Sequence, residues 1–231
     1  MNIFSIGDRL KACAALVRDG AVLADIGTDH GYLPIYLLDE NRIDRAVLSD
    51  INKGPLAKAE ENVTRRGYRN RVSLVLCDGA SALSGCGATD YCICGMGGEL
   101  IADIIAAAPH LKNNKIRLIL QPMSKQEVLR NYLFNSGFSI LKEVYSFDEG
   151  KYYVTVLAEY SGERVEFSAV DAYFGKMNVL VNSEAVLGYM KTKARSLESV
   201  IKGKREGGVD TSTEEHLLTA LEERFGIRSS L

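Results

Sequence analysis

Aspartates and glycines recur where buried apolar runs end, and side chains of these types could bind a ligand there. The first such segment is DIGTDHGY at residues 25–32, between the apolar run 21–26 and a helical pattern. A glycine at this turn lets the backbone approach a ligand closely, and a helix start favours a negative group such as a carboxylate. The Asp25 carboxylate could accept a hydrogen bond from a ligand ammonium or order a water. The alternative is a tight β-to-α turn with an aspartate at the helix N-cap and no ligand.

Two further aspartates end the next two apolar runs. Asp50 ends the run 46–49, and a carboxylate there can accept both ribose hydroxyls of an adenosine-bearing ligand. Asp78 and Gly79 follow the run 72–76, and Asp78 could accept a hydrogen bond from the exocyclic amine of adenine. Each position alone is also an ordinary turn. Because the carboxyl ends of parallel strands share one edge of a sheet, the three ends together indicate a nucleoside site.

The fourth segment is Gly95-Met96-Gly97-Gly98, which follows the apolar run 91–94. So much glycine leaves the backbone bare beside a ligand, although a flexible turn before a helix would also account for it. A dinucleotide fingerprint starting at Gly27 would need its second glycine where Asp29 stands, which argues against an NAD-linked oxidoreductase.

The elements that must position these residues can be predicted from apolar spacing. Strands are expected at 21–26, 46–49, 72–76, 91–94 and 117–120, with helices between them. Gln121-Pro122 should close the fifth strand, and Ser124 should cap the next helix with Glu127 in a capping box. No helix fits between the runs 139–145 and 151–160, so we expect them to form an antiparallel hairpin.

This pattern predicts an α/β fold with a Rossmann-like parallel sheet covered on both faces and closed by the hairpin. That is the ground plan of class I S-adenosylmethionine (SAM) methyltransferases. We assign residues 1–160 to this SAM-binding domain and residues 161–231 to a small helical domain. Heptad-like spacing in 187–201 and 218–225 predicts a coiled-coil-like antiparallel helix pair there, its last helix capped by Thr211 with Glu214.

Composition excludes several classes of protein. The chain has 231 residues and a net charge of -2, so it does not bind nucleic acid by bulk attraction, although a local basic patch is possible. The odd count of 5 cysteines without a C-x-x-C pair indicates reduced thiols and no zinc site. We expect no signal peptide, because Asp8 and Arg9 precede any long apolar run. We expect no membrane-spanning helix, because no apolar run approaches about 18 residues. We expect a cytoplasmic protein with no metal and no membrane contact; a monomer is favoured, with dimerisation left open.

The segments DIGTDHGYLP (25–34), SDINKGPL (49–56), CDGASAL (77–83), CGMGGELI (94–101) and LILQP (118–122) resemble the bacterial tRNA (adenine-22-N1)-methyltransferase family, the TrmK family. The D-H pair after D-I-G-T and the G-M-G-G segment are more specific than a generic SAM motif. The resemblance covers residues 9–160 and extends to the family's coiled-coil appendage. It implies SAM-dependent methylation of N1 of A22 in the D-arm of tRNA.

Carried over, the resemblance implies a role for each matching position. The methionine end of SAM would lie against Asp25, Gly27 and Gly31, and its ribose and adenine against Asp50, Ile51, Asp78 and Gly79. Gly95, Met96 and Gly97 would shape the methyl-transfer pocket, and His30 is counted among the cofactor-binding residues. Gly98, Gln121 and Pro122 would form the substrate side of that pocket.

Adenine N1 has an in-plane lone pair, so no proton must leave before methylation, and the product carries a positive charge. We expect the Asp29 carboxylate to stabilise that charge as the catalytic residue; its alternative roles are fixing the loop or binding SAM. Tyr32 could stack on a flipped base, or it could belong to the helix core. His30 could hydrogen-bond the substrate base or a phosphate, and it could equally be a loop histidine satisfied by the backbone.

Residues 188–205 hold six basic side chains and one acidic side chain, Glu198. We expect Lys191, Lys193 and Arg195 to contact tRNA phosphates, with Arg9 as a further contact; a solvated helix face is the alternative. Two other functions stay open on the residues alone. They are a SAM enzyme that acts on a small molecule and a non-catalytic module that binds tRNA or SAM.

Overall fold

The fold is built on a single mixed sheet of seven strands, in the order β3-β2-β1-β4-β5-β7-β6. The computed structural model describes residues 4–177 and 184–228. Strands β1 to β5 are parallel, whereas β7 pairs antiparallel with both β5 and β6. The strands are β1 (Val22–Ile26), β2 (Arg45–Asp50), β3 (Val72–Leu76), β4 (Asp90–Gly97), β5 (Arg117–Ser124), β6 (Phe138–Asp148) and β7 (Lys151–Tyr160). The predicted Rossmann-like sheet closed by an antiparallel hairpin is confirmed.

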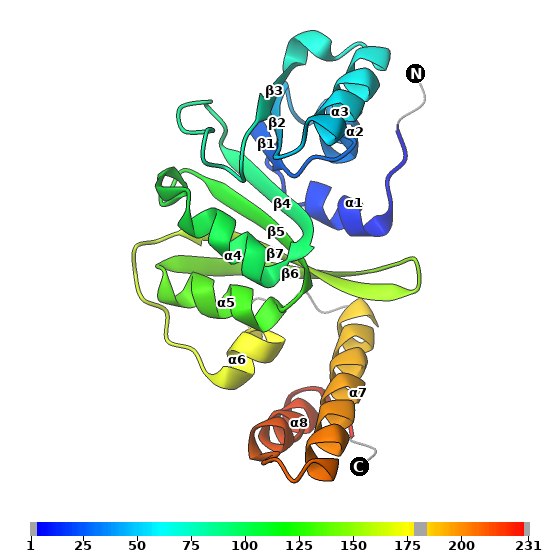
Figure 1. Cartoon of the computed structure of the whole chain (residues 1–231), viewed down its shortest axis with the longest axis vertical. Helices are drawn as coiled ribbons and strands as arrows, with labels where there is room; N and C mark the ends of the chain where they lie inside the picture. The colour runs from blue at the N-terminus through cyan, green and yellow to red at the C-terminus, as the bar shows by residue number, and fades with distance from the viewer. Residues whose placement is uncertain (1–3, 178–183, 229–231) are drawn as a thin grey trace.

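Helices cover both faces of this sheet (Figure 1). Those preceding the hairpin are α1 (Asp8–Ala14), α2 (Tyr32–Asp39), α3 (Lys53–Arg65), α4 (Gly98–Ala106) and α5 (Gln126–Asn135), with short 3-10 turns at Arg69–Arg71 and Pro109–Leu111. Alternation along β1 divides the core, because successive strand residues face opposite sides. Leu23 packs with α1, α2 and α3, whereas Ala24 and Ile26 pack with α4 and α5.

The structure differs from expectation where β5 ends. Gln121 and Pro122 continue the strand, because they pair with Cys94 and Met96 of β4 at a register irregularity that tolerates a proline. Strand β5 therefore includes Ser124, and the residue that precedes α5 is Lys125. Lys125 has a left-handed backbone, and no side chain caps the helix. The predicted Ser124 capping box is wrong.

The C-terminal part of the chain is helical, with α6 (Ala169–Phe174), α7 (Glu184–Glu206) and α8 (Ser212–Phe225). Helices α7 and α8 pack side by side beyond the β6 edge of the sheet (Figure 1). The predicted cap of α8 is wrong, because the Thr211 hydroxyl donates to Glu215 and Glu214 instead pairs with Lys204. The apolar residues of these helices join the same buried cluster as α4 and α5.

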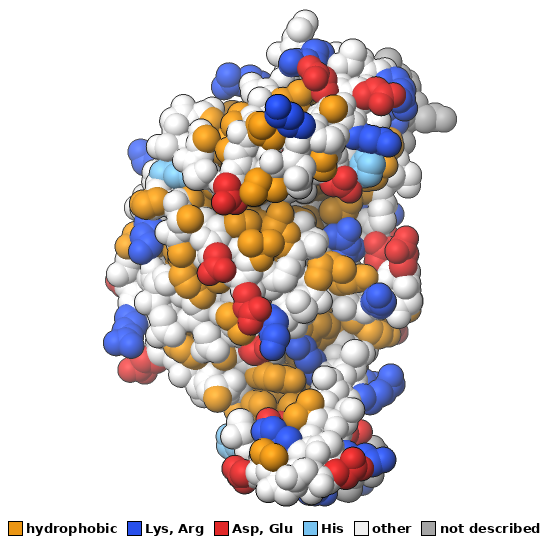
Figure 2. Space-filling view, in the orientation of Figure 1, with side chains coloured by type: hydrophobic (Ala, Val, Ile, Leu, Met, Phe, Trp, Pro, Cys, Tyr) orange, Lys and Arg blue, Asp and Glu red, His pale blue; other side chains and the backbone are white. Residues whose placement is uncertain are grey.

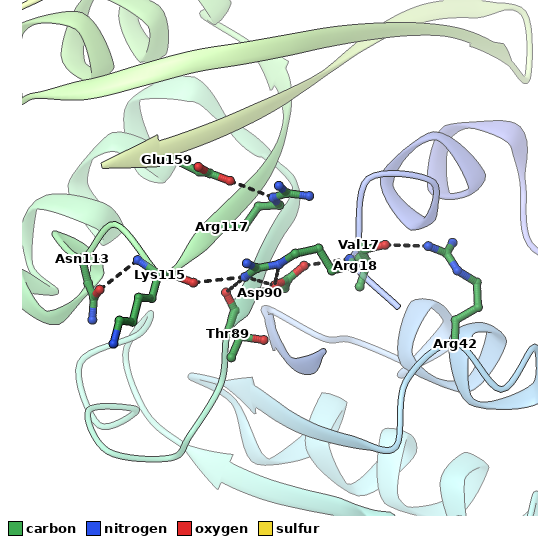
Figure 3. Close-up of polar contacts among 9 residues, drawn as sticks. All are labelled: Val17, Arg18, Arg42, Thr89, Asp90, Asn113, Lys115, Arg117 and Glu159. Atoms are coloured by element: carbon green, nitrogen blue, oxygen red, sulfur yellow. Dashed lines mark hydrogen bonds and ion pairs between the residues drawn. The ribbon is translucent and has the colours of Figure 1, made fainter. Parts of the chain in front are cut away.

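A polar network holds the sheet together at the amino ends of its central strands (Figure 3). Asp90, at the start of β4, is fully buried, and it accepts from the Arg18 backbone at 2.9 Å and from Arg18 Nε at 2.8 Å. Arg18 also donates to the carbonyls of Thr89 and Lys115. Because the network lies at the opposite ends of the strands from the three aspartates discussed above, it stabilises the fold away from the ligand edge.

Acidic and basic side chains are interspersed over the face shown in Figure 2, and no single-sign field dominates it. This distribution agrees with the net charge of -2. Within residues 4–177 and 184–228, no helix is long and apolar enough to cross a membrane. The same residues contain no group of three or more His, Cys, Asp or Glu side chains arranged to hold a metal ion.

Candidate active site

A pocket of about 570 Å³ opens at the carboxyl ends of β1 to β4. Strand β1 pairs with both β2 and β4, so the strand order reverses there, and open α/β sheets bind ligands at such a point. The pocket collects most of the predicted site residues: Arg9, Asp25, Gly27, Asp29, His30, Tyr32, Asp50, Ile51, Asp78, Gly79, Gly95 and Met96.

The turn after β1 places a buried carboxylate on the pocket floor. Asp25 is 6 % exposed, and its Oδ2 accepts a hydrogen bond from the Thr28 hydroxyl at 2.6 Å. Burial raises the pKa of Asp25 to about 7. Gly27 has φ +69, and a Cβ there would overlap the Met96 side chain. The turn is therefore built to bring its backbone and one carboxylate close to a ligand, and a cationic ligand group would favour the charged form of Asp25.

Asp29 occupies a backbone conformation that usually belongs to glycine. Its φ is +48, and its side chain is 70 % exposed, with Oδ2 3.4 Å from His30 Nε2. The His30 ring stacks on Tyr32 with centroids 4.9 Å apart, and Asn62 donates to the His30 carbonyl at 3.0 Å. A left-handed non-glycine residue stores local strain, and such residues cluster at functional sites. This loop therefore holds the Asp29 carboxylate at the pocket despite a conformational cost.

The pocket carries a negative charge. Its lining includes the carboxylates of Asp25, Asp29, Asp50 and Asp78, against the single guanidinium of Arg9. Asp50 ends β2 and accepts from the Asn52 backbone at 2.8 Å, so its carboxylate is fixed at the rim. This charge suits a ligand with positive groups and disfavours a pyrophosphate.

The glycine-rich segment forms the end of β4 and the start of α4. Met96 and Gly95 line the pocket, whereas Gly97 is the residue before α4 and Gly98 is buried at its first position. A Cβ on Gly98 would overlap the Lys125 carbonyl oxygen. Gly98 therefore allows the close approach of α4 to the end of β5, and it does not line the pocket itself.

Gln121 links three elements at the pocket wall. Its Oε1 accepts from Arg9 Nη1 at 2.7 Å and from the Gly95 backbone at 3.1 Å. The Arg9 backbone in turn donates to Asp148 of the hairpin at 3.1 Å. Gln121 and Pro122 are buried and stand behind the lining, so the structure gives Gln121 the task of orienting Arg9 and Gly95.

Sequence patterns missed part of the lining: Leu10, Ile26, Thr28, Leu33, Asn52, Cys77, Cys94, Leu100 and Ile104. The Asp25-x-x-Thr28 spacing on a tight turn was a usable signal for one of them. The apolar residues on helices α1, α2 and α4 gave no such signal, because the rotation of a helix about its axis depends on packing. Gly31 also lies outside the lining. It is the residue before α2, its φ is +69, and a Cβ there would press on the Leu48 side chain.

The three basic residues that were predicted to contact phosphates lie on α7, outside the pocket lining. Their side chains differ in exposure. Lys191 and Arg195 are exposed, and both border a surface groove with Arg228. The Lys193 side chain is only 15 % exposed, and its Nζ donates to Gln126 of α5 at 2.8 Å. The predicted phosphate contact of Lys193 therefore does not fit its largely buried position. The exposed positions of Lys191 and Arg195 are compatible with phosphate contacts, which stay a prediction.

The residues present fit SAM. A buried carboxylate with a raised pKa suits the methionine ammonium, the bare turn at Gly27 suits close approach, and Asp50 and Asp78 suit an adenosine. The sheet order, with its antiparallel β7, and this pocket define a class I methyltransferase.

Comparison with known proteins agrees with this class. Residues 6–156 match the family model described as a methyltransferase domain. The Bacillus subtilis protein named tRNA (adenine(22)-N(1))-methyltransferase is 35% identical over 164 residues, which cover 71% of this chain and 68% of that protein. The chain belongs to the tRNA (adenine-22-N1)-methyltransferase family, as the resemblance predicted.

Solved structures are similar over nearly the whole chain. A Streptococcus pneumoniae protein assigned as a tRNA (m1A22) methyltransferase, in complex with SAM, has a TM-score of 0.82 and 30% identity, covering 95% of this chain and 99% of that one. The B. subtilis m1A22 tRNA methyltransferase TrmK has a TM-score of 0.73 and 28% identity, covering 96% and 97%. The similarity therefore includes the C-terminal helices.

Proposed function

We propose that this protein transfers a methyl group from SAM to N1 of adenine 22 in tRNA. The observation that carries the proposal is the negatively charged pocket at the strand-order reversal, in a chain of this family. When bound, SAM supplies an electrophilic methyl group on a sulfonium. The cofactor-binding residues are those of the three strand ends, with Asp25, Asp50 and Asp78 at their centre.

The protein's main task is alignment. Adenine N1 attacks through a lone pair in the plane of the ring, so no general base is needed, and the rate depends on holding nucleophile and methyl group in line. The G-M-G-G turn and the Gln121-oriented Arg9 border the space in which the base must enter. Asp29 acts as the catalytic residue by stabilising the positive charge that develops on the adenine.

The helical residues 161–231 form the tRNA-contacting part in this proposal. The exposed Lys191 and Arg195 lie one helical turn apart on α7 and border the same groove as Arg228. Contacts of this kind bind phosphates with strong salt dependence. We place the reaction in the cytoplasm, with the protein acting as a monomer.

The test compares two unmodified tRNA transcripts that differ only at position 22. With radiolabelled SAM, the transcript with A22 should become labelled, and the transcript with G22 should not. Equal labelling of both would contradict the assigned base, and labelling of neither would leave a small-molecule methyltransferase or a non-catalytic tRNA-binding module as the better description.

A further inference from the structure

A buried polar cluster lies behind the site, at the junction of α5, β6, α6 and α7, and methyl transfer makes no use of it. Its centre is Arg130 of α5, which is fully buried. Arg130 donates to both carboxylate oxygens of Glu143 on β6, at 2.6 and 3.1 Å, and the Tyr145 hydroxyl donates to the same carboxylate at 2.8 Å. The sheet part of the molecule therefore carries an enclosed, nearly satisfied ion pair.

The same guanidinium reaches into the C-terminal helices. Arg130 Nη1 donates to the carbonyls of Ala172 at 3.2 Å and Tyr173 at 3.0 Å, near the end of α6. Burying an ion pair costs desolvation energy, and its best-attested use is to specify one arrangement of packed elements. Here the arrangement is that of α6 on α5.

Lys193 makes the reciprocal connection from α7 to α5. Its Nζ donates to Gln126 Oε1 at 2.8 Å and lies 4.0 Å from Glu127 Oε2. The ammonium also lies 4.9 Å from the Tyr173 ring centroid and 5.7 Å from that of Tyr189, which are cation-π distances. Arg130 of α5 is thus bound by carbonyls of α6, and Lys193 of α7 is bound by Gln126 of α5.

The inward position of Lys193 also decides which way the basic stripe of α7 faces, the stripe being the exposed side chains of Lys191 and Arg195. Residues two apart on a helix differ by about 200° around its axis, so Lys191 and Arg195 lie opposite Lys193. The structure shows both exposed while Lys193 is largely buried. Helix α5 begins at the end of β5, and the carbonyl before it lies against Gly98 of the G-M-G-G turn. One helix therefore connects the pocket wall to the seat of α7.

We propose that Arg130 and Lys193 are positioning residues that fix the basic stripe of α7 relative to the methyl-transfer pocket. The proposal rests on the proposed function, because it needs tRNA as the substrate that α7 grips. Lys193 acts through Gln126 and contacts no phosphate.

The experiment compares Lys193→Met, Gln126→Leu and the double variant, with Lys193→Arg as the conservative replacement. Each single change should raise the KM for tRNA about tenfold, with kcat and the Kd for SAM within twofold of wild type. The double variant should be no worse than Lys193→Met alone, because Gln126 acts on α7 through Lys193. Lys193→Arg should restore most of the loss. Lys112→Met, at an exposed lysine beyond the pocket, is the matched control.

Two results would overturn the positioning role. If Gln126→Leu has a wild-type KM while Lys193→Met does not, or if the double variant is worse than Lys193→Met, then Lys193 does not act through Gln126. If the Kd for SAM weakens in parallel with the KM, the junction supports the whole fold and not the stripe. Failure of the wild-type protein to methylate any tRNA would instead refute the proposed function, so the two failures are separable.

Discussion

At the scale of single residues, Asp29 combines a carboxylate at the pocket with a backbone that glycine would adopt at lower cost. Its φ of +48 and 70 % exposed side chain show that packing does not explain the residue. A non-glycine residue in this strained conformation is best explained by a function of its side chain, here the carboxylate. A catalytic carboxylate and a carboxylate that merely fixes the loop therefore predict opposite effects of a glycine substitution on stability.

Asp29→Gly should therefore stabilise the protein while removing its activity. Relief of the left-handed strain should raise the free energy of unfolding by up to about 1 kcal/mol. Loss of the carboxylate should lower kcat by about 100-fold, with the Kd for SAM little changed. Asp29→Asn should lose kcat similarly, whereas Asp44→Asn, at an exposed loop carboxylate, should not. A destabilised Asp29→Gly protein would favour the loop-fixing role.

Asp25 gives the binding of SAM a predictable pH dependence. Its pKa of about 7 means that the carboxyl is largely protonated at pH 6 and must ionise to accept the ligand ammonium. A raised acid pKa favours the neutral form below pH 7, so affinity should fall as the pH falls, by roughly five- to tenfold between pH 7.5 and pH 6. Calorimetric titration should show this slope in wild type. Asp25→Asn should bind more weakly and without the slope, and a wild-type-like slope in that variant would assign the titration elsewhere.

At the scale of elements, the pocket depends on close approaches between segments distant in sequence. Gly98 begins α4 directly against the carbonyl that precedes α5. The same contact aligns the G-M-G-G turn with the end of β5. A side chain at position 98 would force these two elements apart.

Gly98→Ala should consequently cost about 1–3 kcal/mol of unfolding free energy, as for other overpacked sites. Gly203→Ala is the matched control, because Gly203 lies within α7 and a Cβ there would point into open space. There the better helix propensity of alanine should stabilise the protein by up to about 1 kcal/mol. Urea denaturation would measure both, and equal effects of the two substitutions would contradict the packing argument.

Local signals in the sequence predicted the strands and the carboxylates at their ends, because apolar runs and turn residues depend mainly on neighbours along the chain. The predicted end of β5 was wrong, because pairing with β4 continues the strand through Pro122. The predicted helix caps at Ser124 and Thr211 were also wrong. Packing sets the backbone geometry at a helix start, and that geometry decides whether a side chain reaches a backbone amide. The burial of Lys193 could have been predicted, because Met190 and Leu197 lie on the same face of the helix at 3-4 spacing. Its charge instead suggested an exposed side chain.

At the scale of the whole molecule, the catalytic pocket and the basic stripe have different electrostatic tasks. The pocket is negative, and the face drawn in Figure 2 mixes both signs. Attraction to tRNA must therefore come from local contacts such as Lys191 and Arg195, whereas the net charge of -2 limits indiscriminate binding.

Replacing Lys191 and Arg195 together by methionine should weaken tRNA binding and flatten its salt dependence. Each lost phosphate contact should reduce the slope of log K against log salt by about 0.7–0.9, so the double variant should lose about 1.5. The Kd for SAM should stay the same, because neither residue lines the pocket. An unchanged salt slope would show that another surface grips the tRNA.

The most direct test of the account is to identify the methylated atom. An unmodified tRNA transcript that carries A22 would be incubated with the protein and SAM, digested, and analysed by nucleoside mass spectrometry together with mapping of the modified position. The account predicts 1-methyladenosine at position 22, formed by the wild-type protein and almost absent with Asp29→Asn. A methyl group on another base or another atom of A22, or no methylated nucleoside at all, would contradict it.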